Sequence, residues 1–169
     1  GGLPNLPRFG VQFNMPEGSE RLRYFGRGEA ESYIDKRLAS KLGEYEVAVS
    51  EHFEHYVRPQ ENMAHTDTRW AYVSSLAGHG LLFAMTGEPF SFNCSHYTPE
   101  QLTAAAHDYE LVPLRETVVN LDYRHNGIGS ASCGPTLNPR WQLAATEFDF
   151  SVRIMPAFVN NIDPYEEMI

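Results

Sequence analysis

The chain has 169 residues with 42% hydrophobic and 12% aromatic side chains, which is the length of one domain with enough apolar surface for a core. Its formal net charge is −9 and it has no lysine- or arginine-rich run, so neither nucleic acid nor an anionic membrane surface is expected as a partner. No apolar run approaches the length of a membrane span. Cys94 and Cys133 are too few for a disulfide framework, so free thiols and a cytoplasmic location are expected, although a bridge between them stays open.

Short segments with alternating apolar residues, divided by turn residues, predict an all-β chain. The sequence Ala-Gly-His-Gly at 77–80 predicts the turn of a hairpin. The last segment places Phe148, Phe150, Val152 and Ile154 on one face. The expected strands are residues 9–13, 21–25, 70–76, 81–86, 90–92, 117–123 and 147–154.

Helical signals are few. Thr98 as N-cap, Pro99 at the first helical position and Gln101 as capping-box partner predict one short helix over residues 99–107. Residues 29–42 have partial helical spacing, which indicates a turn or two. These elements predict a single antiparallel β-sandwich domain over residues 1–159, followed by a flexible acidic tail at 160–169.

The most distinctive segment is residues 117–135, TVVNLDYRHNGIGSASCGP, in which a strand-like apolar run ends at Asp122 and a glycine-rich loop follows. Glycine allows the backbone to turn through positive φ and to approach a ligand closely. Functional groups often lie on loops that a rigid scaffold holds in place. The segment therefore predicts a shaped wall at the end of a sheet, beside a pocket.

Conventional catalytic and metal-binding patterns are weak. His52 and His55 are three residues apart and could ligate a metal from one helical face, but no third ligand is evident, so a solvated polar segment is the preferred interpretation. Cys133 lacks an assignable base and is predicted to be a wall residue rather than a nucleophile. No catalytic residue or metal ligand is assigned. The close carboxylate pairs are interpreted as surface charge: Glu29 with Glu31, Glu44 with Glu46, and Glu166 with Glu167.

A polar cluster at residues 58–62 has a different character. Arg58, Glu61 and Asn62 follow an aromatic strand-like dipeptide and can form charge-assisted hydrogen bonds with one another. Such a network either ties down a turn between the sheets or binds the hydroxyl groups of a sugar. The structural role is the preferred interpretation, because buried polar groups need partners in any case.

Several motifs follow one another from about residue 6 to residue 156. The glycine loop contributes the last of them, running from Asn120-Leu-Asp122 through Gly127-Ile-Gly129 to Cys133-Gly-Pro135. The earlier motifs are Leu6-Pro-Arg-Phe-Gly10, Phe25-Gly-Arg-Gly28 with Glu31-Ser-Tyr33 and Asp35, Tyr56-Val-Arg-Pro-Gln-Glu-Asn62, Asp67-Thr-Arg-Trp70, and Pro89-Phe-Ser-Phe92 with Tyr97. In this order they resemble the carboxy-terminal β-sandwich of family-2 β-galactosidases, which also occurs as the small chain of two-subunit forms.

The resemblance implies a galactose-mutarotase-like supersandwich with one or two short helices, and a role beside catalysis rather than in it. In such enzymes two glutamates on a (β/α)₈ barrel carry out retaining hydrolysis of terminal β-galactosides such as lactose. The sandwich places one loop over the pocket of that barrel. In some members this loop presents a tryptophan to the sugar, and Cys133, with Ser132 and Gly134 beside it, stands at the matching position. The chain alone is therefore expected to be inactive.

The resemblance also implies that the chain is the later part of a larger sandwich. Its expected partners are the catalytic and other domains of a parent β-galactosidase, the galactoside at their junction, and further copies of itself through uncovered apolar edges. No cofactor is expected in this chain, whereas parent enzymes often use Mg²⁺ and Na⁺ elsewhere. The alternative is an independent carbohydrate-binding or aldose-mutarotase-like module.

Overall fold

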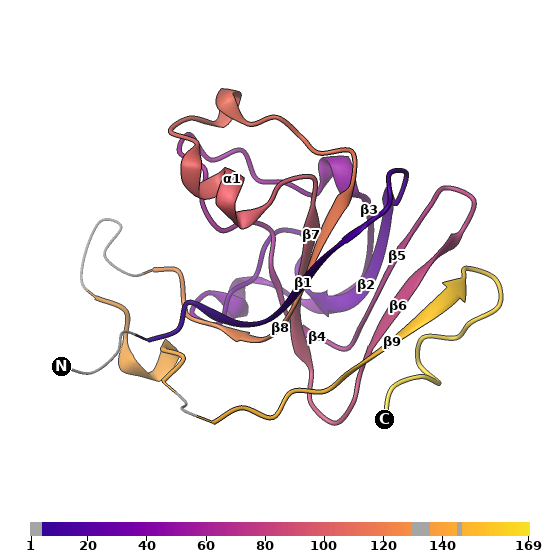
Figure 1. The fold of residues 1–169 in the computed structure, drawn as a ribbon. Coiled ribbons are helices and arrows are strands. Elements are labelled where there is room, and N and C mark those ends of the chain that lie inside the picture. The colour runs from indigo at the N-terminus through magenta and orange to yellow at the C-terminus, as the bar shows by residue number, and fades with distance from the viewer. Residues whose placement is uncertain (1–4, 130–135, 145–146) are drawn as a thin grey trace.

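The computed structural model describes residues 5–129, 136–144 and 147–169, which form a two-layered β structure (Figure 1). One short α-helix, α1 (Pro99–Ala104), lies at one end of the sheets, and four 3-10 turns lie in the connections (Figure 1). The strands are β1 (Arg8–Met15), β2 (Arg21–Arg27), β3 (Leu42–Ala48), β4 (His65–Thr68), β5 (Trp70–Ser74), β6 (His79–Met85), β7 (Phe90–Ser95), β8 (Thr117–His125) and β9 (Val152–Phe158).

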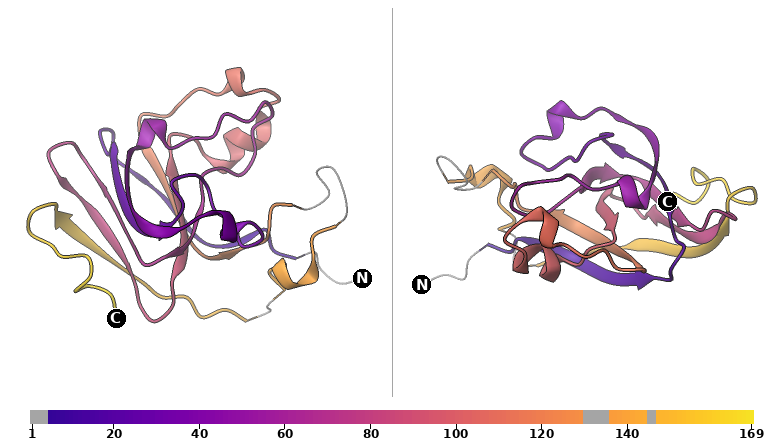
Figure 2. Two further views of the ribbon diagram at one scale, coloured as in Figure 1. Left: turned by 180° about the vertical axis from the view of Figure 1, so that it is seen from behind. Right: turned by 90° about the horizontal axis from the view of Figure 1, so that it is seen from above.

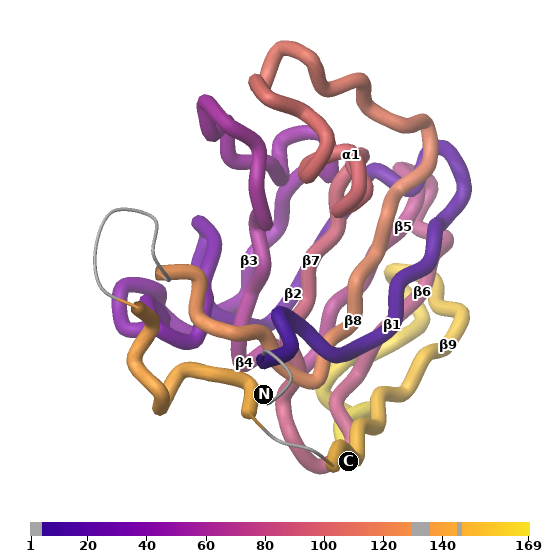
Figure 3. Tube along the Cα trace, turned by 60° about the vertical axis from the view of Figure 1, so that its left-hand side comes forward, coloured from indigo at the N-terminus to yellow at the C-terminus, as the bar shows by residue number. Residues whose placement is uncertain are grey.

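The strands form two antiparallel sheets, which Figures 2 and 3 show from further directions. The first sheet has the order β1-β8-β7-β4 and the second has the order β3-β2-β5-β6-β9. Every pair of neighbouring strands is antiparallel. This arrangement confirms the predicted antiparallel β-sandwich.

The core lies between the two sheets. Leu22 and Phe83 from the second sheet meet Phe92 and Leu121 from the first, and all four side chains are fully buried. Strand periodicity produces this layer, because every second residue of each strand points to the same face. Cys94 belongs to the same layer and is a free, buried cysteine.

A second apolar cluster covers the outer face of the second sheet. Trp70 and Tyr72 form its buried centre. Ile162 and Met168 from the end of the chain pack against this cluster, and Tyr165 meets the Trp70 ring edge-on with centroids 6.0 Å apart. The expectation of a flexible tail at 160–169 stays a prediction, but these contacts give the segment a defined place along the sheet.

Two strands were not predicted from the sequence, and both pair with strands that are distant in the sequence. β3 carries Glu44 and Glu46, whose charges hide its alternation, yet the Glu46 carboxylate lies 2.6 Å from Arg21 on the paired strand β2. β4 is only four residues long, is followed closely by β5, and pairs with β7. A short strand of polar residues gives no alternating apolar signal, so only its pairing identifies it.

Several predicted ends are wrong. The first hairpin strand, expected over 70–76, ends at Ser74, and the second begins at His79, inside the turn expected at 77–80. The strand expected over 147–154 begins at Val152, because the Phe148 ring stacks on Phe9 with centroids 4.3 Å apart before the strand starts. The helix expected over 99–107 has the predicted Thr98–Gln101 capping box but ends at Ala104. Its last turn is lost because the Glu110 carboxylate accepts the Ala106 N–H at 2.8 Å, which draws the chain out of the helix. Residues 29–42 contain one 3-10 turn, Arg37–Ala39.

The edge strands β1 and β9 carry exposed apolar side chains. Phe9 is 40% exposed, Val11 51% and Ile154 47%. These residues leave apolar surface open at the outer edge of each sheet, while self-association through it remains a prediction. None of the helices in the described ranges has the length and apolarity that a membrane span requires.

Truncation of the central layer should therefore be costly. We expect Leu121→Ala to lower the free energy of unfolding by about 2–5 kcal/mol, because it removes a fully buried side chain and leaves a cavity. The matched control is Leu76→Ala, because Leu76 lies in the hairpin turn and is 82% exposed. We expect this substitution to change the free energy of unfolding by less than about 0.5 kcal/mol. Urea denaturation followed by circular dichroism measures both, and equal effects would contradict the assigned core.

Candidate functional site

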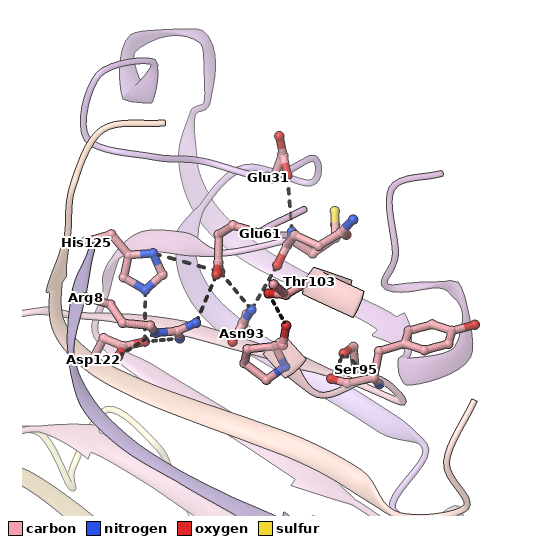
Figure 4. A network of polar contacts seen from close by, with 12 residues as sticks. Arg8, Glu31, Glu61, Asn93, Ser95, Thr103, Asp122 and His125 are labelled. Atoms are coloured by element: carbon pink, nitrogen blue, oxygen red, sulfur yellow. Dashed lines mark hydrogen bonds and ion pairs between the residues drawn. The ribbon is translucent and has the colours of Figure 1, made fainter. Parts of the chain in front are cut away.

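The carboxyl end of β8 gathers buried and half-buried charged and amide side chains from several elements (Figure 4). Arg8 comes from β1, Asn93 from β7, Asp122 and His125 from β8, and Glu61 from the segment that precedes β4. We call these residues the Arg8 cluster. In Figure 4 their side chains point toward one another.

Arg8 forms the centre of the cluster. Its guanidinium binds both oxygens of Asp122, with Nη2 2.5 Å from Oδ2 and Nε 3.1 Å from Oδ1. The remaining Nη1 lies 3.0 Å from Glu61 Oε2. This fork geometry combines charge with direction, so a single side chain links β8 to the segment that carries Glu61.

The second partner of Asp122 is a histidine on its own strand. His125 Nε2 lies 2.9 Å from Asp122 Oδ2, and its Nδ1 is 4.0 Å from Glu61 Oε1. Burial by itself would raise the pKa of Asp122, but the hydrogen bonds from His125 and Arg8 outweigh burial and lower that pKa below its ordinary value. Asp122 is therefore a charged carboxylate at neutral pH, although it is only 2% exposed.

Amide groups extend the cluster into the segment before β4. Asn93 Nδ2 donates to the Asn62 carbonyl at 2.9 Å, and Asn62 Nδ2 donates to the Glu54 carbonyl at 2.7 Å. The Glu54 N–H returns a hydrogen bond to Asn62 Oδ1 at 2.8 Å. Asn62 thus closes the turn that brings Glu61 to Arg8.

Nearby, Glu31 serves as a second buried acceptor. It takes a hydrogen bond from the Met63 N–H at 3.2 Å and further ones from Tyr56 and Lys36. Met63 has a positive φ of 48°, which is uncommon for a residue other than glycine. The Glu31 carboxylate thus anchors a strained backbone position next to the Arg8 cluster.

The glycine loop begins where β8 ends, and its described ends are held from two sides. We call residues 126–129 and 138–143 the stem of the loop. The Asp35 carboxylate accepts the N–H groups of Ile128 at 3.2 Å and Gly129 at 2.9 Å. A Cβ on Gly127 would lie 2.7 Å from Asp35 Cγ, so glycine is required for this close approach.

The other side of the stem is joined by backbone contacts. The Gly127 N–H donates to the Trp141 carbonyl at 3.0 Å, and the Leu143 N–H donates to Asn126 Oδ1 at 2.5 Å. The loop therefore leaves and rejoins the sandwich at one place, fixed by Asp35 and Asn126.

The structure brings together some of the residues singled out in the sequence. Glu61 and Asn62 lie in the network of the Arg8 cluster, whereas the Arg58 side chain is exposed and Arg8 supplies the guanidinium. Cys133, Ser132 and Gly134 fall outside the described residues. Arg8 and Asp35 had no assigned site role, because the Asp122 partner of Arg8 and the Gly129 partner of Asp35 are 114 and 94 residues away in the sequence.

The histidine pair of the sequence analysis is divided between two environments. His52 is fully buried, whereas His55 is 73% exposed and lies 2.8 Å from the Asp108 carboxylate. They share no helical face. Within the described ranges no group of three or more histidine, cysteine, aspartate or glutamate side chains is placed to hold a metal ion.

The Asp122 carboxylate differs from the acid of a glycosidase. A carboxyl group that donates a proton to a glycosidic oxygen needs a raised pKa, and the pKa of Asp122 is lowered. The cavity beside His125, lined also by Arg37, Asp67 and Tyr123, measures about 170 Å³. Pockets that enclose a small-molecule ligand usually measure about 300–1,000 Å³, so this cavity is too small to bury a sugar alone.

Known proteins match this chain over most of its length. The family model described as "Beta galactosidase small chain" matches residues 2–154. A β-galactosidase of Actinobacillus pleuropneumoniae is 41% identical over 146 residues, which are 86% of this chain and 14% of that protein. A β-galactosidase of Staphylococcus xylosus is 36% identical over 151 residues, which are 89% of this chain and 15% of that protein.

A relative of smaller size is the "Beta-galactosidase small subunit" of Latilactobacillus sakei. It is 34% identical over 165 residues, covering 89% of this chain and 51% of that subunit. The chain thus spans about one seventh of the large relatives and about half of the small subunit.

The charge of Asp122 should contribute to stability in a pH-dependent way. We expect Asp122→Asn to lower the free energy of unfolding at pH 7 by about 2–3 kcal/mol, less than a fully buried pair would lose, because Arg8 is partly exposed and keeps Glu61. Since the folded pKa of Asp122 is lowered, its contribution is complete above the ordinary carboxyl pKa near 4 and is lost as the pH falls through the folded pKa.

Urea denaturation of both proteins between pH 7 and pH 3 measures this difference. The control is Glu88→Gln, which removes the partner of the exposed Arg124 at 3.6 Å and should cost less than about 1 kcal/mol at every pH. If the difference in the free energy of unfolding between wild type and Asp122→Asn grew as the pH fell, this would contradict a charged, stabilising Asp122.

Proposed function

Because the chain belongs to the β-galactosidase small-chain family, we propose that it is a non-catalytic component of a retaining β-galactosidase that completes the wall of the sugar pocket. The reaction would be hydrolysis of terminal β-D-galactosides such as lactose. The catalytic glutamates would lie on a separate barrel domain or subunit, which makes that barrel the principal partner. Any requirement for Mg²⁺ or Na⁺ would also belong to that part of the enzyme.

The observation that carries this proposal is the fixed stem of the glycine loop. Asp35 and Asn126 hold the two ends of the loop with three hydrogen bonds to backbone N–H groups. Holding a loop in this way lowers its conformational freedom before a ligand arrives, which favours binding of a ligand by its shape.

The charges of the Arg8 cluster support a role in shape rather than in chemistry. Retaining hydrolysis needs one carboxylate as nucleophile and another carboxyl group as proton donor. Here Arg8 binds Asp122 and Glu61 at once, so both carboxylates are engaged by a cation inside the domain. The cluster then serves to hold β8 and the stem in place.

Within this proposal Cys133 is the residue of the loop nearest to the galactoside. A cysteine cannot stack on a sugar face as an indole does, so the aglycone side of the pocket would be more open than in relatives with tryptophan. Cys94 does not compete as a reactive thiol, because burial raises its pKa and keeps it protonated. Within this chain, Cys133 is therefore a selective point for testing the contact.

We predict that Cys133→Trp, made in the full-length β-galactosidase that contains this chain, lowers KM for an aryl galactoside by about 2–10-fold. This factor corresponds to the binding free energy of one aromatic contact. The matched control is Cys133→Ser, which keeps the size of the side chain and should change KM less than about twofold. Steady-state kinetics with lactose and an aryl galactoside measures both variants. Identical KM values for the two variants with both substrates would contradict a place for Cys133 at the sugar.

A further inference from the structure

Two histidines meet inside the sandwich, apart from the Arg8 cluster. His52 follows the 3-10 turn Val49–Glu51, and His65 begins β4. Both rings are fully buried, and their Nε2 atoms lie 2.7 Å apart. The other ring nitrogens face carbonyl groups: His52 Nδ1 lies 2.7 Å from the Cys94 oxygen, and His65 Nδ1 lies 2.8 Å from the Arg27 oxygen.

These contacts fix the number of protons that the pair needs. A carbonyl oxygen only accepts hydrogen bonds, so each Nδ1 must carry a proton. A neutral imidazole carries a single proton, which leaves both Nε2 atoms as unprotonated acceptors facing each other. The 2.7 Å contact becomes a hydrogen bond only when a third proton lies between the two Nε2 atoms.

Among the residues that the structure describes, the surroundings of the pair supply no compensating negative charge. Tyr24 from β2 stacks on His65 with centroids 4.3 Å apart and donates its hydroxyl proton to the Gly28 carbonyl. Cys94 from β7 is a buried thiol, and burial raises the pKa of both Tyr24 and Cys94, which keeps both neutral. Tyr45 from β3 stacks on the far side of Tyr24.

The nearest carboxylates act on these neighbours and not on the rings. Glu29 raises the pKa of Tyr24, and Glu20 raises the pKa of Cys94 while its carboxylate lies 2.9 Å from His96. Burial lowers the pKa of His52 to about 4, and burial together with His52 lowers the pKa of His65 well below its ordinary value. The third proton is therefore bound only in acid.

We propose that His52 and His65 form a binding site for one proton, and that this proton ties together the two ends of the segment between them. Transfer of a proton from a hydronium ion to one Nε2 atom forms an N–H bond there, breaks an O–H bond of the hydronium ion and releases a water molecule. In the neutral pair the two lone pairs repel, and the contact opens. The proposal concerns proton binding alone and does not depend on galactoside binding.

The position of the pair gives it a route to the Arg8 cluster. Residues 53–64 lie between the two histidines and carry Glu61, which binds Arg8, and Asn62, which is bound by Asn93. The positive φ of 48° at Met63 and 55° at Asp67 places strained backbone on both sides of His65. A change in the separation of the rings therefore acts on a short, closed segment that already stores strain.

The experiment is an NMR titration of the full 169-residue chain labelled with ¹⁵N in its histidine rings and backbone. Between pH 7.5 and the acid limit of folding, we expect both Nδ1 atoms to remain protonated. We expect the two Nε2 signals to change together with one midpoint and an uptake of one proton by the pair. The backbone amide signal of Asn62 should shift with the same midpoint.

Two glutamine variants make the test specific. In His52→Gln the side-chain amide provides a permanent N–H donor to His65 Nε2, so the Asn62 signal should lose the midpoint of the pair. His55→Gln removes the exposed histidine of the same segment and should leave that midpoint unchanged. Three results would overturn the proposal. The two rings could titrate with separate midpoints and take up one proton each, or both rings could stay neutral until the chain unfolds. The third such result is an Asn62 signal that keeps the midpoint of the pair in His52→Gln.

Discussion

The ion pair between Arg8 and Asp122 is the contact on which the functional end of this domain depends. A carboxylate that is 2% exposed is costly unless a cation and hydrogen bonds compensate it, and Arg8 and His125 supply both. The pairing of strands β1 and β8 is irregular next to this ion pair, where the register shifts between Phe9 and Gly10. A Cβ on Gly10 would lie 2.4 Å from Asp122 Oδ1, so the residue opposite the carboxylate has to be glycine.

The rest of the site follows from where Arg8 is held. Its third nitrogen reaches Glu61, and hydrogen bonds through Asn62 and Asn93 fix the segment that carries this glutamate. Three residues beyond Asp122, His125 ends β8 and the chain enters the stem that Asp35 holds. A single buried charge pair thereby sets the position of two segments that are far apart in the sequence. In this network both carboxylates, Asp122 and Glu61, bind the Arg8 guanidinium.

Local sequence signals predicted the elements that depend on local interactions. The hairpin of β5 and β6 and the Thr98 capping box are correct, because their turn and cap residues lie within a few positions of each other. The start of β9 was missed because Phe148 finds its partner, Phe9, on another strand. The interpretation of the carboxylate pairs as surface charge agrees with the exposed ion pairs of Glu44 and Glu46. It is wrong for Glu31, which is buried and accepts hydrogen bonds from distant residues. For the site, Glu61 and Asn62 stood out as a dense polar motif, whereas Arg8 and Asp35 have no local pattern around them that marks a buried partner.

A crystal structure of the full-length β-galactosidase with a galactoside bound would test the central claim most directly, namely that this domain contributes shape and not chemistry. The account predicts that the glycine loop lies at the rim of the sugar pocket with Asp35 still bound to the Ile128 and Gly129 N–H groups. It also predicts that Asp122 and Glu61 remain on Arg8, away from the glycosidic oxygen. A loop that faces bulk solvent, or either carboxylate within hydrogen-bond distance of the scissile bond, would contradict it.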